Sequence, residues 1–197
     1  MNLPLFPLNT LLYPGCMLDL QIFEPRYLDM VARCMKAGEG FGVVRIVEGL
    51  EVGPAASAFA AIGCEALIRD WEQRPNGLLG IRVEGGRRFS VMESGVQPDQ
   101  LTLAEVDWLP EPENPSLGED YPDLVALLEA LGEHPMVEAL GMRGAASGLS
   151  DLAYRLAYLL PFKPEQKLLL LQTDLAEARL ALIQELLEQM QDGAPVD

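Results

Sequence analysis

A short acidic and proline-rich stretch, residues 111–118, separates two parts of the sequence with different hydrophobic periodicities. Before this stretch, apolar residues form short runs or alternate with polar ones, a pattern typical of β-strands. After it, leucines recur at the spacing of an amphipathic helix. The pattern predicts an α+β protein with a β-rich domain over residues 1–110, a linker over 111–120 and a helical domain over 121–192.

The first part of the sequence predicts several short strands. They are expected at residues 3–8, 17–22, 41–47, 59–69, 78–84, 87–93 and 102–108. Pro4 and Pro7 cannot donate hydrogen bonds to a ladder, so the first strand is expected at a sheet edge. The glycine-containing segments 75–77 and 85–86 predict tight hairpin turns. So many short strands in about a hundred residues predict a closed or partly open β-barrel.

One helix is expected within this strand-rich part, over residues 25–37. Apolar residues recur there at helical spacing, which predicts a buried face made of Tyr27, Met30, Val31 and Cys34. Pro25 suits the first helical position, and Gly38 suits a left-handed C-terminal cap.

The second part of the sequence predicts helices that pack together as a bundle. They are expected at residues 124–131, 151–160, 164–171 and 174–190. Ser150 is expected to be the N-cap of the second of these helices, because serine favours that position.

The chain is strongly acidic, with 30 acidic against 14 basic residues and a formal net charge of −16. This charge repels the phosphate backbone, so nucleic acid is not expected as a partner. No apolar run approaches the ~18 residues that span a bilayer, and no basic, apolar leader opens the sequence. Cys16, Cys34 and Cys64 lack the paired spacing of a disulfide or zinc motif. A soluble protein with reduced cysteines in the cytoplasm is therefore expected.

The sequence contains no recognisable catalytic, cofactor or metal motif, and we predict that the protein is not an enzyme. A glycine-rich loop ending in Gly-Lys-Ser/Thr, which holds nucleotide phosphates, is missing. His134 is the only histidine, so it cannot form a triad or a histidine-rich metal site by itself, and a solvated or capping role is expected. No catalytic residue, cofactor or metal ligand is assigned.

Residue types that are enriched at protein-binding hot spots occur in the strand-rich part. We select Trp71, Arg74, Arg82 and Trp108 as candidate contacts with a protein or peptide. Packing in the core or at its rim is the alternative for each of them, and the oligomeric state stays open.

Several motifs resemble the amino-terminal substrate-binding domain of Lon proteases. They include Leu-Pro-Leu-Phe-Pro-Leu at residues 3–8, Tyr-Pro-Gly at 13–15, Ile-Phe-Glu-Pro-Arg-Tyr at 22–27 and Gly-Arg-Arg-Phe at 86–89. The resemblance continues through the expected helices after residue 160 and covers nearly the whole chain. It departs from the family pattern at Cys64, where threonine is common.

The resemblance implies a PUA-like barrel followed by helices, in a stand-alone, non-catalytic module that binds proteins and acts as an adaptor or in substrate recognition for proteolysis. It also implies structural roles for the motif residues Phe23, Glu24, Pro25, Arg26, Tyr27, Arg88 and Phe89. Glu24 and Arg26 are expected to cap or brace the helix, and Phe23 to fill the barrel side. The alternative is a sensor of small molecules or modified peptides, with a pocket between barrel and helices.

Overall fold

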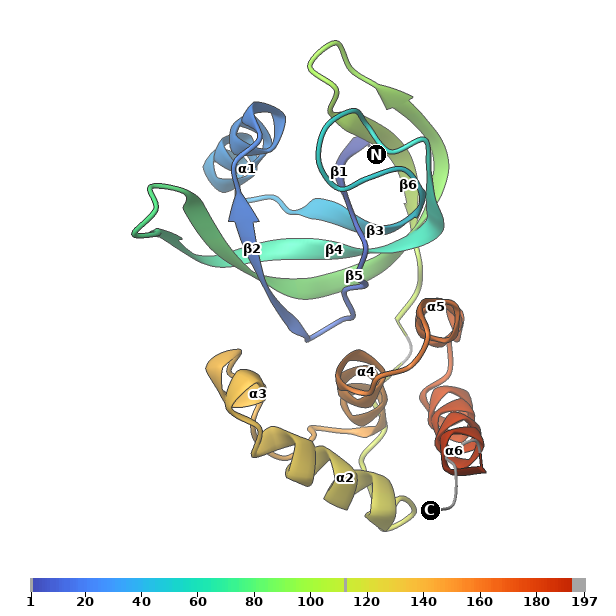
Figure 1. Cartoon of the computed structure of the whole chain (residues 1–197). Coiled ribbons are helices and arrows are strands. Elements are labelled where there is room, and N and C mark those ends of the chain that lie inside the picture. Colours follow the sequence, from blue (N-terminus) through green and yellow to red (C-terminus); the bar gives the residue numbers. More distant parts are fainter. Residues whose placement is uncertain (1, 112, 193–197) are drawn as a thin grey trace. The chain divides into compact units, whose positions relative to one another are not determined.

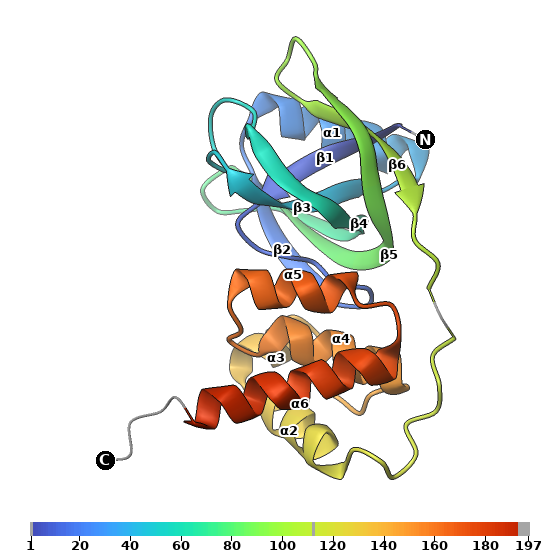
Figure 2. The ribbon, with the colours of Figure 1, turned by 90° about the vertical axis from the view of Figure 1, so that its right-hand side faces the viewer.

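The computed structural model describes residues 2–111 and 113–192 (Figures 1 and 2). The chain divides into two compact units, Met1–Pro110 and Glu111–Asp197. The first unit contains the strands and one helix, and the second contains the remaining helices. The mixed α+β class expected from the sequence is confirmed.

The first unit is a six-stranded sheet with one helix, α1 (Pro25–Ala37). Its strands are β1 (Asn2–Leu8), β2 (Met17–Ile22), β3 (Phe41–Glu48), β4 (Ala58–Gln73), β5 (Leu79–Val96) and β6 (Thr102–Trp108). The strand order is β2-β5-β4-β3-β1-β6, and β5 also pairs with β6. The pairings therefore form a closed ring of five strands, in the order β5-β4-β3-β1-β6. Strand β2 pairs with β5 alone. Because of this branch the sheet is not a clean barrel. Of the expected architecture, a mixed α+β fold with a six-stranded sheet is confirmed.

One hydrophobic cluster in the core of the first unit lies between β1, β3, β5 and β6. It consists of Leu3, Leu5, Val44, Phe89, Ala104 and Val106. Two glycines make room for the ring of Phe89, since a Cβ atom would lie 2.7 Å from the ring at Gly42 and 2.5 Å from it at Gly63. Phe89 is therefore a fully buried member of this cluster.

Strand β5 corrects the sequence prediction of two strands separated by a turn at Gly85 and Gly86. The strand runs through both glycines without reversing. Gly85 instead lies against the loop before β2: its N–H donates to the Cys16 carbonyl at 2.8 Å, and its carbonyl accepts from the Gly15 N–H at 2.8 Å. A Cβ atom on Gly85 would lie 1.9 Å from the Tyr13 carbonyl oxygen. Glycine is needed there for close backbone approach.

The other expected hairpin turn, at residues 75–77, is confirmed. It joins β4 to β5, Gly77 has a φ of 81°, and the Arg74 N–H donates to the Leu78 carbonyl at 2.8 Å. In Figure 1 the resulting hairpin projects beneath α1.

The prediction that the first strand lies at an edge is wrong, because β1 lies between β3 and β6. The sheet accommodates the two prolines of β1 because the strand changes its pairing partner along its length. Residues 2–5 pair with β6, whereas residues 5–8 pair with β3 in parallel. Each half of β1 therefore has one unpaired flank, where Pro4 and Pro7 cost no ladder hydrogen bond.

Helix α1 confirms its predicted bounds, with Pro25 in the first turn and Gly38 at the C-terminal end. Gly38 has a left-handed φ of 69°, and the Glu39 N–H behind it donates to the Cys34 carbonyl at 3.0 Å. The predicted apolar face of the helix is buried.

The second unit consists of α2 (Pro122–Gly132), α3 (Pro135–Ala139), α4 (Leu149–Leu159), α5 (Pro164–Gln172) and α6 (Ala176–Asp192). Helix α4 contacts α2, α5 and α6. The buried Arg179 of α6 donates to the Leu170 carbonyl at 2.9 Å and to the Tyr154 hydroxyl at 3.1 Å. The short helix α3 was not predicted. The prediction of a capping role for His134 is confirmed, because its Nδ1 accepts from the Met136 N–H at 3.2 Å.

The start of α4 corrects the prediction that Ser150 is an N-cap, since Gly148 has that position. The proline-rich segment before the helices supplies the acceptors instead. The Asn114 Oδ1 accepts from the Ser150 N–H, and the Pro115 carbonyl accepts from the Leu149 N–H, each at 2.9 Å. Residues 114 and 115 are therefore hydrogen-bonded to the first turn of α4.

Candidate functional site

Three of the four candidate partner-binding residues lie together, on the β4–β5 hairpin. Trp71, Arg74 and Arg82 line one depression of about 220 Å³ with Asp19, Asp70 and the hairpin backbone. Trp71 and Asp70 also line a second depression of about 250 Å³, between the C-terminal end of α1 and β4. Trp71 is 58% exposed, an unusual state for so large an apolar side chain.

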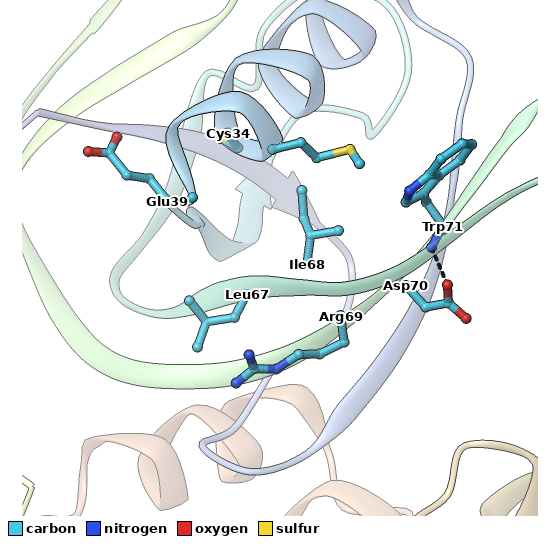
Figure 3. Close-up of a pocket in the computed structure, with 9 residues that line it drawn as sticks. Cys34, Glu39, Leu67, Ile68, Arg69, Asp70 and Trp71 are labelled. Carbon is cyan, nitrogen blue, oxygen red and sulfur yellow. Dashed lines mark hydrogen bonds between the residues drawn. The ribbon is translucent and has the colours of Figure 1, made fainter.

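The depression between α1 and β4, which we call the α1–β4 groove, is bordered by apolar side chains. Met35 comes from α1, and Leu67, Ile68 and Trp71 come from β4. Figure 3 shows Ile68 and Trp71 pointing toward the α1 side of β4, whereas Arg69 points to the other side. Met35 is 41% exposed. The groove thus presents a flexible thioether and an indole to solvent, a combination suited to apolar partners.

The arginines around the groove are held in ion pairs. Arg82 on β5 forms two hydrogen bonds with Asp19 on β2, at 2.7 and 2.8 Å. This hydrogen bonding with Arg82 holds the pKa of Asp19 below its ordinary value, and it raises the pKa of Arg82. Arg69 pairs with Glu84 at 2.6 Å. The Arg82 side chain therefore links β5 to β2.

Arg74 lies along the hairpin, with its Nε 3.4 Å from a Glu72 carboxylate oxygen. Its side chain crosses Gly80, where a Cβ atom would lie 2.8 Å from the same Nε. Gly80 thus makes room for Arg74 beside Trp71.

Trp108, the fourth candidate, does not join this site. It is half-buried at the end of β6, where it packs on the core and meets Phe89 edge-to-face with ring centroids 6.0 Å apart. The Arg87 guanidinium lies 3.8 Å above the indole. For Trp108 the core-rim alternative describes the contacts that the structure shows.

Arg26 connects the helix motif to two loops. This 5% exposed side chain donates to the Gly53 carbonyl at 2.7 Å and to the Gln100 carbonyl at 2.9 Å, and it pairs with Glu24 at 2.9 Å. Gln100 has a left-handed φ of 70°, and it is the one non-glycine residue among those described with a positive φ. Arg26 thus braces the β3–β4 and β5–β6 loops against α1.

The remaining motif residues differ in their surroundings. Phe23 is 48% exposed, so the expectation that it fills the barrel side is wrong. Glu24 makes no side-chain cap hydrogen bond at the start of α1. Tyr27 is buried against Phe6, with ring centroids 4.1 Å apart, and burial raises the pKa of its hydroxyl. Arg88 is buried and donates to the Pro110 carbonyl at 3.3 Å.

The described residues offer no metal site and no activated cysteine. Residues 2–111 and 113–192 contain no cluster of three or more His, Cys, Asp or Glu side chains that could hold a metal ion. Cys16, Cys34 and Cys64 are buried, and none of them forms a disulfide within the described part of the chain. Burial raises the pKa of the Cys34 thiol at the α1–β4 groove, which disfavours the reactive thiolate. None of the helices described has both the length and the apolar content to span a membrane.

The chain matches the family model of the ATP-dependent protease La (LON) substrate-binding domain over residues 2–189. It belongs to this family. The crystal structure of a Lon N-terminal domain protein from Xanthomonas campestris is 34% identical, with 99% of each chain covered and a TM-score of 0.74. The N-terminal domain of the Mycobacterium avium complex Lon protease is 19% identical over 93% of this chain and 96% of its own, with a TM-score of 0.62. That second likeness shows the fold alone.

Membership in the Lon substrate-binding domain family implies a non-catalytic module with a protein-binding role in proteolysis. The family predicted from the motifs is thereby confirmed. Sequence reasoning had selected Trp71 but missed Met35 and Ile68. A signal for Met35 existed, because Leu28, Ala32 and Met35 recur at helical spacing beside the predicted buried face of α1.

Proposed function

We propose that this Lon substrate-binding domain captures exposed apolar segments of other proteins in the α1–β4 groove and acts as an adaptor in their proteolysis. The observation that carries the proposal is the exposed indole of Trp71 beside Met35 and Ile68, in a member of a substrate-binding family. Unfolded or damaged proteins expose apolar side chains of this kind, whereas folded ones bury them.

The size of the groove favours peptide side chains over an enclosed small molecule. Its volume is about 250 Å³. Sites that enclose drug-sized ligands usually have volumes of about 300–1,000 Å³. An open groove of this size accommodates one or two side chains of a longer segment, and the rest of the segment can extend beyond it.

We place this binding in the reducing cytoplasm. Support comes from the three cysteines, which are buried and form no disulfide in the part of the chain that the structure describes. Proteins of oxidising compartments more often use their cysteines in disulfides.

An array of immobilised thirteen-residue peptides tests the proposal when it is probed with the full chain. We expect retention of peptides that contain bulky apolar residues. Trp71→Ala should weaken their binding at least tenfold, since a central exposed tryptophan is a typical hot spot. Met35→Ala should weaken it less.

Met92→Ala is the matched control, because Met92 is a 62% exposed methionine on β5 that does not line the groove. It should leave binding unchanged. Equal binding by the original chain, Trp71→Ala and Met35→Ala would remove the groove from consideration, and so would an array on which no peptide is retained.

A further inference from the structure

The two halves of β4 differ in their backbone pairing. Between Ala58 and Ala66 the strand pairs with β3. From Ile62 to Gln73 it pairs with β5. Among the described residues, the segment 67–73 therefore has a strand neighbour on one side only. This segment, which we call the open edge of β4, contains Leu67, Ile68 and Trp71 of the α1–β4 groove.

The direction of the backbone groups along the open edge follows from the hairpin. The Arg74 N–H points toward β5, since it donates to the Leu78 carbonyl at 2.8 Å. In an antiparallel pair, alternate residues direct their N–H and C=O groups to opposite sides. Gln73 and Trp71 therefore direct theirs away from β5. Consistent with this, the Trp71 N–H donates to the Asp70 carboxylate at 2.8 Å (dashed line in Figure 3).

Asp70 protects the open edge in the way that natural edge strands are protected. A register shift between Ile68 and Asp70 interrupts the ladder with β5, and the carboxylate covers the outward amide of Trp71. Bulges and charged side chains at an edge discourage pairing with another copy of the same chain. A ligand that supplies its own carbonyl to Trp71 releases this carboxylate.

The charges around the groove favour a basic ligand. Arg69, Arg74 and Arg82 each have an acidic partner. Of the acidic residues that line the groove, neither Asp70 nor Glu39 forms an ion pair within the described part of the chain. The charge of Asp70 acts on Arg82, but Arg82 is hydrogen-bonded to Asp19. An incoming lysine or arginine therefore meets two carboxylates that form no close ion pair among the described residues.

We propose that an extended polypeptide segment adds as a strand along the open edge of β4, with an apolar side chain on Trp71 and a neighbouring lysine or arginine on Asp70. A carbonyl of the segment replaces the Asp70 carboxylate as acceptor for the Trp71 N–H. Strand addition supplies affinity through the backbone, and side-chain pockets supply specificity. This inference rests on the proposed function, to which it adds the binding mode and the chemistry of the substrate.

Fluorescence anisotropy tests the binding mode with the full chain and a labelled probe peptide, Gly-Ser-Arg-Val-Phe-Val-Arg-Ser-Gly. Two N-methylated forms of the peptide carry the methyl groups on alternate sets of amides. One form loses the donors that face β4, and the other loses donors that face solvent. We expect at least a tenfold loss of affinity for one form and less than a twofold change for the other. Equal effects of the two forms would overturn strand addition.

The Asp70→Asn variant tests the charge preference. It should weaken binding of the arginine probe by about two- to fivefold, the range of an exposed ion pair. Binding of a probe with glutamine in place of both arginines should not change. Asp107→Asn, at an exposed position of β6, is the matched control and should leave both affinities unaltered. Identical behaviour of Asp70→Asn and the original chain would overturn the pairing of Asp70 with a basic residue.

The failures of the two proposals are distinguishable. If Trp71→Ala abolishes binding but the N-methyl and Asp70→Asn arms have no effect, the groove binds peptides in another mode, and only this inference falls. If no probe binds, both proposals fall. If sedimentation shows a dimer that Trp71→Ala disrupts but the probe does not dissociate, the open edge is occupied by a second copy of the chain, which overturns the inference.

Discussion

Trp71 and Trp108, the two tryptophans of the chain, have opposite surroundings although both lie near the ends of strands. Trp108 packs on Phe89 and is covered by Arg87. Trp71 extends from a half-strand with one open edge, and most of its surface is exposed. The comparison indicates that the closed part of the sheet buries its aromatic side chains against the core, whereas the hairpin that projects from it leaves one exposed to solvent.

Replacing each tryptophan by alanine should separate these two roles most strongly. Trp108→Ala should lower the free energy of unfolding by about 2–4 kcal/mol, since it leaves a void over the core. Trp71→Ala should change it by no more than about 0.5 kcal/mol, as expected for an exposed position. Urea denaturation followed by circular dichroism measures both. Similar losses in the two variants would remove the distinction between them.

Removing the Arg87 side chain, which covers Trp108, should lower the free energy of unfolding by less than Trp108→Ala does. Arg87→Ala removes the guanidinium that lies 3.8 Å from the indole, and its ion pair with Glu65 at 3.3 Å. We expect a loss of about 0.5–1 kcal/mol, in the range of exposed cation–π contacts. A double-mutant cycle with Trp108→Ala isolates the contact, and Arg33→Ala on the exposed face of α1 is the control. A coupling energy near zero would mean that Arg87 does not stabilise Trp108.

The ion pair between Asp19 and Arg82 should contribute least to the free energy of unfolding, and its contribution should depend on pH. Arg82 holds the pKa of Asp19 below its ordinary value of 3.8. The stabilisation is therefore complete above that value and is lost as the pH falls through the lower pKa of the folded state. Because both side chains are about one-third exposed, we expect no more than about 0.5 kcal/mol.

Unfolding of the original chain and of Asp19→Asn, compared between pH 6 and pH 2.5, measures this contribution. The difference between the two proteins should be constant down to about pH 4.5 and then shrink. A difference that grows on acidification would contradict the assignment.

The sequence predicted those parts of the fold whose signals are local. Helix α1 begins at Pro25 and ends before Gly38, since both residues favour helix ends through their own backbone preferences. The turn predicted at Gly85 is wrong because glycine is needed there for close approach to the Tyr13 carbonyl, which is distant in sequence. The edge position predicted from Pro4 and Pro7 is wrong for a similar reason, because β1 changes its partner strand between these two residues.

The candidate site was predictable only in part. Composition selected both tryptophans, but nothing in their neighbouring residues distinguishes the exposed indole of Trp71 from the half-buried one of Trp108. The difference arises from pairing, since β3 leaves β4 at Ala66 while β5 and β6 remain paired as far as Trp108. Such pairing depends on the whole sheet, and residue periodicity alone does not encode it.

The hydrogen bond between Asn114 and the first turn of α4 decides how the protein should be dissected. Asn114 and Pro115 supply acceptors for two amides of a helix that begins more than thirty residues later. A recombinant fragment cut at the first residue of α2 loses both acceptors, and Gly148 loses the carboxamide packed against it. The helical unit therefore has to be expressed with the proline-rich segment attached, although that segment has the composition of a disposable spacer.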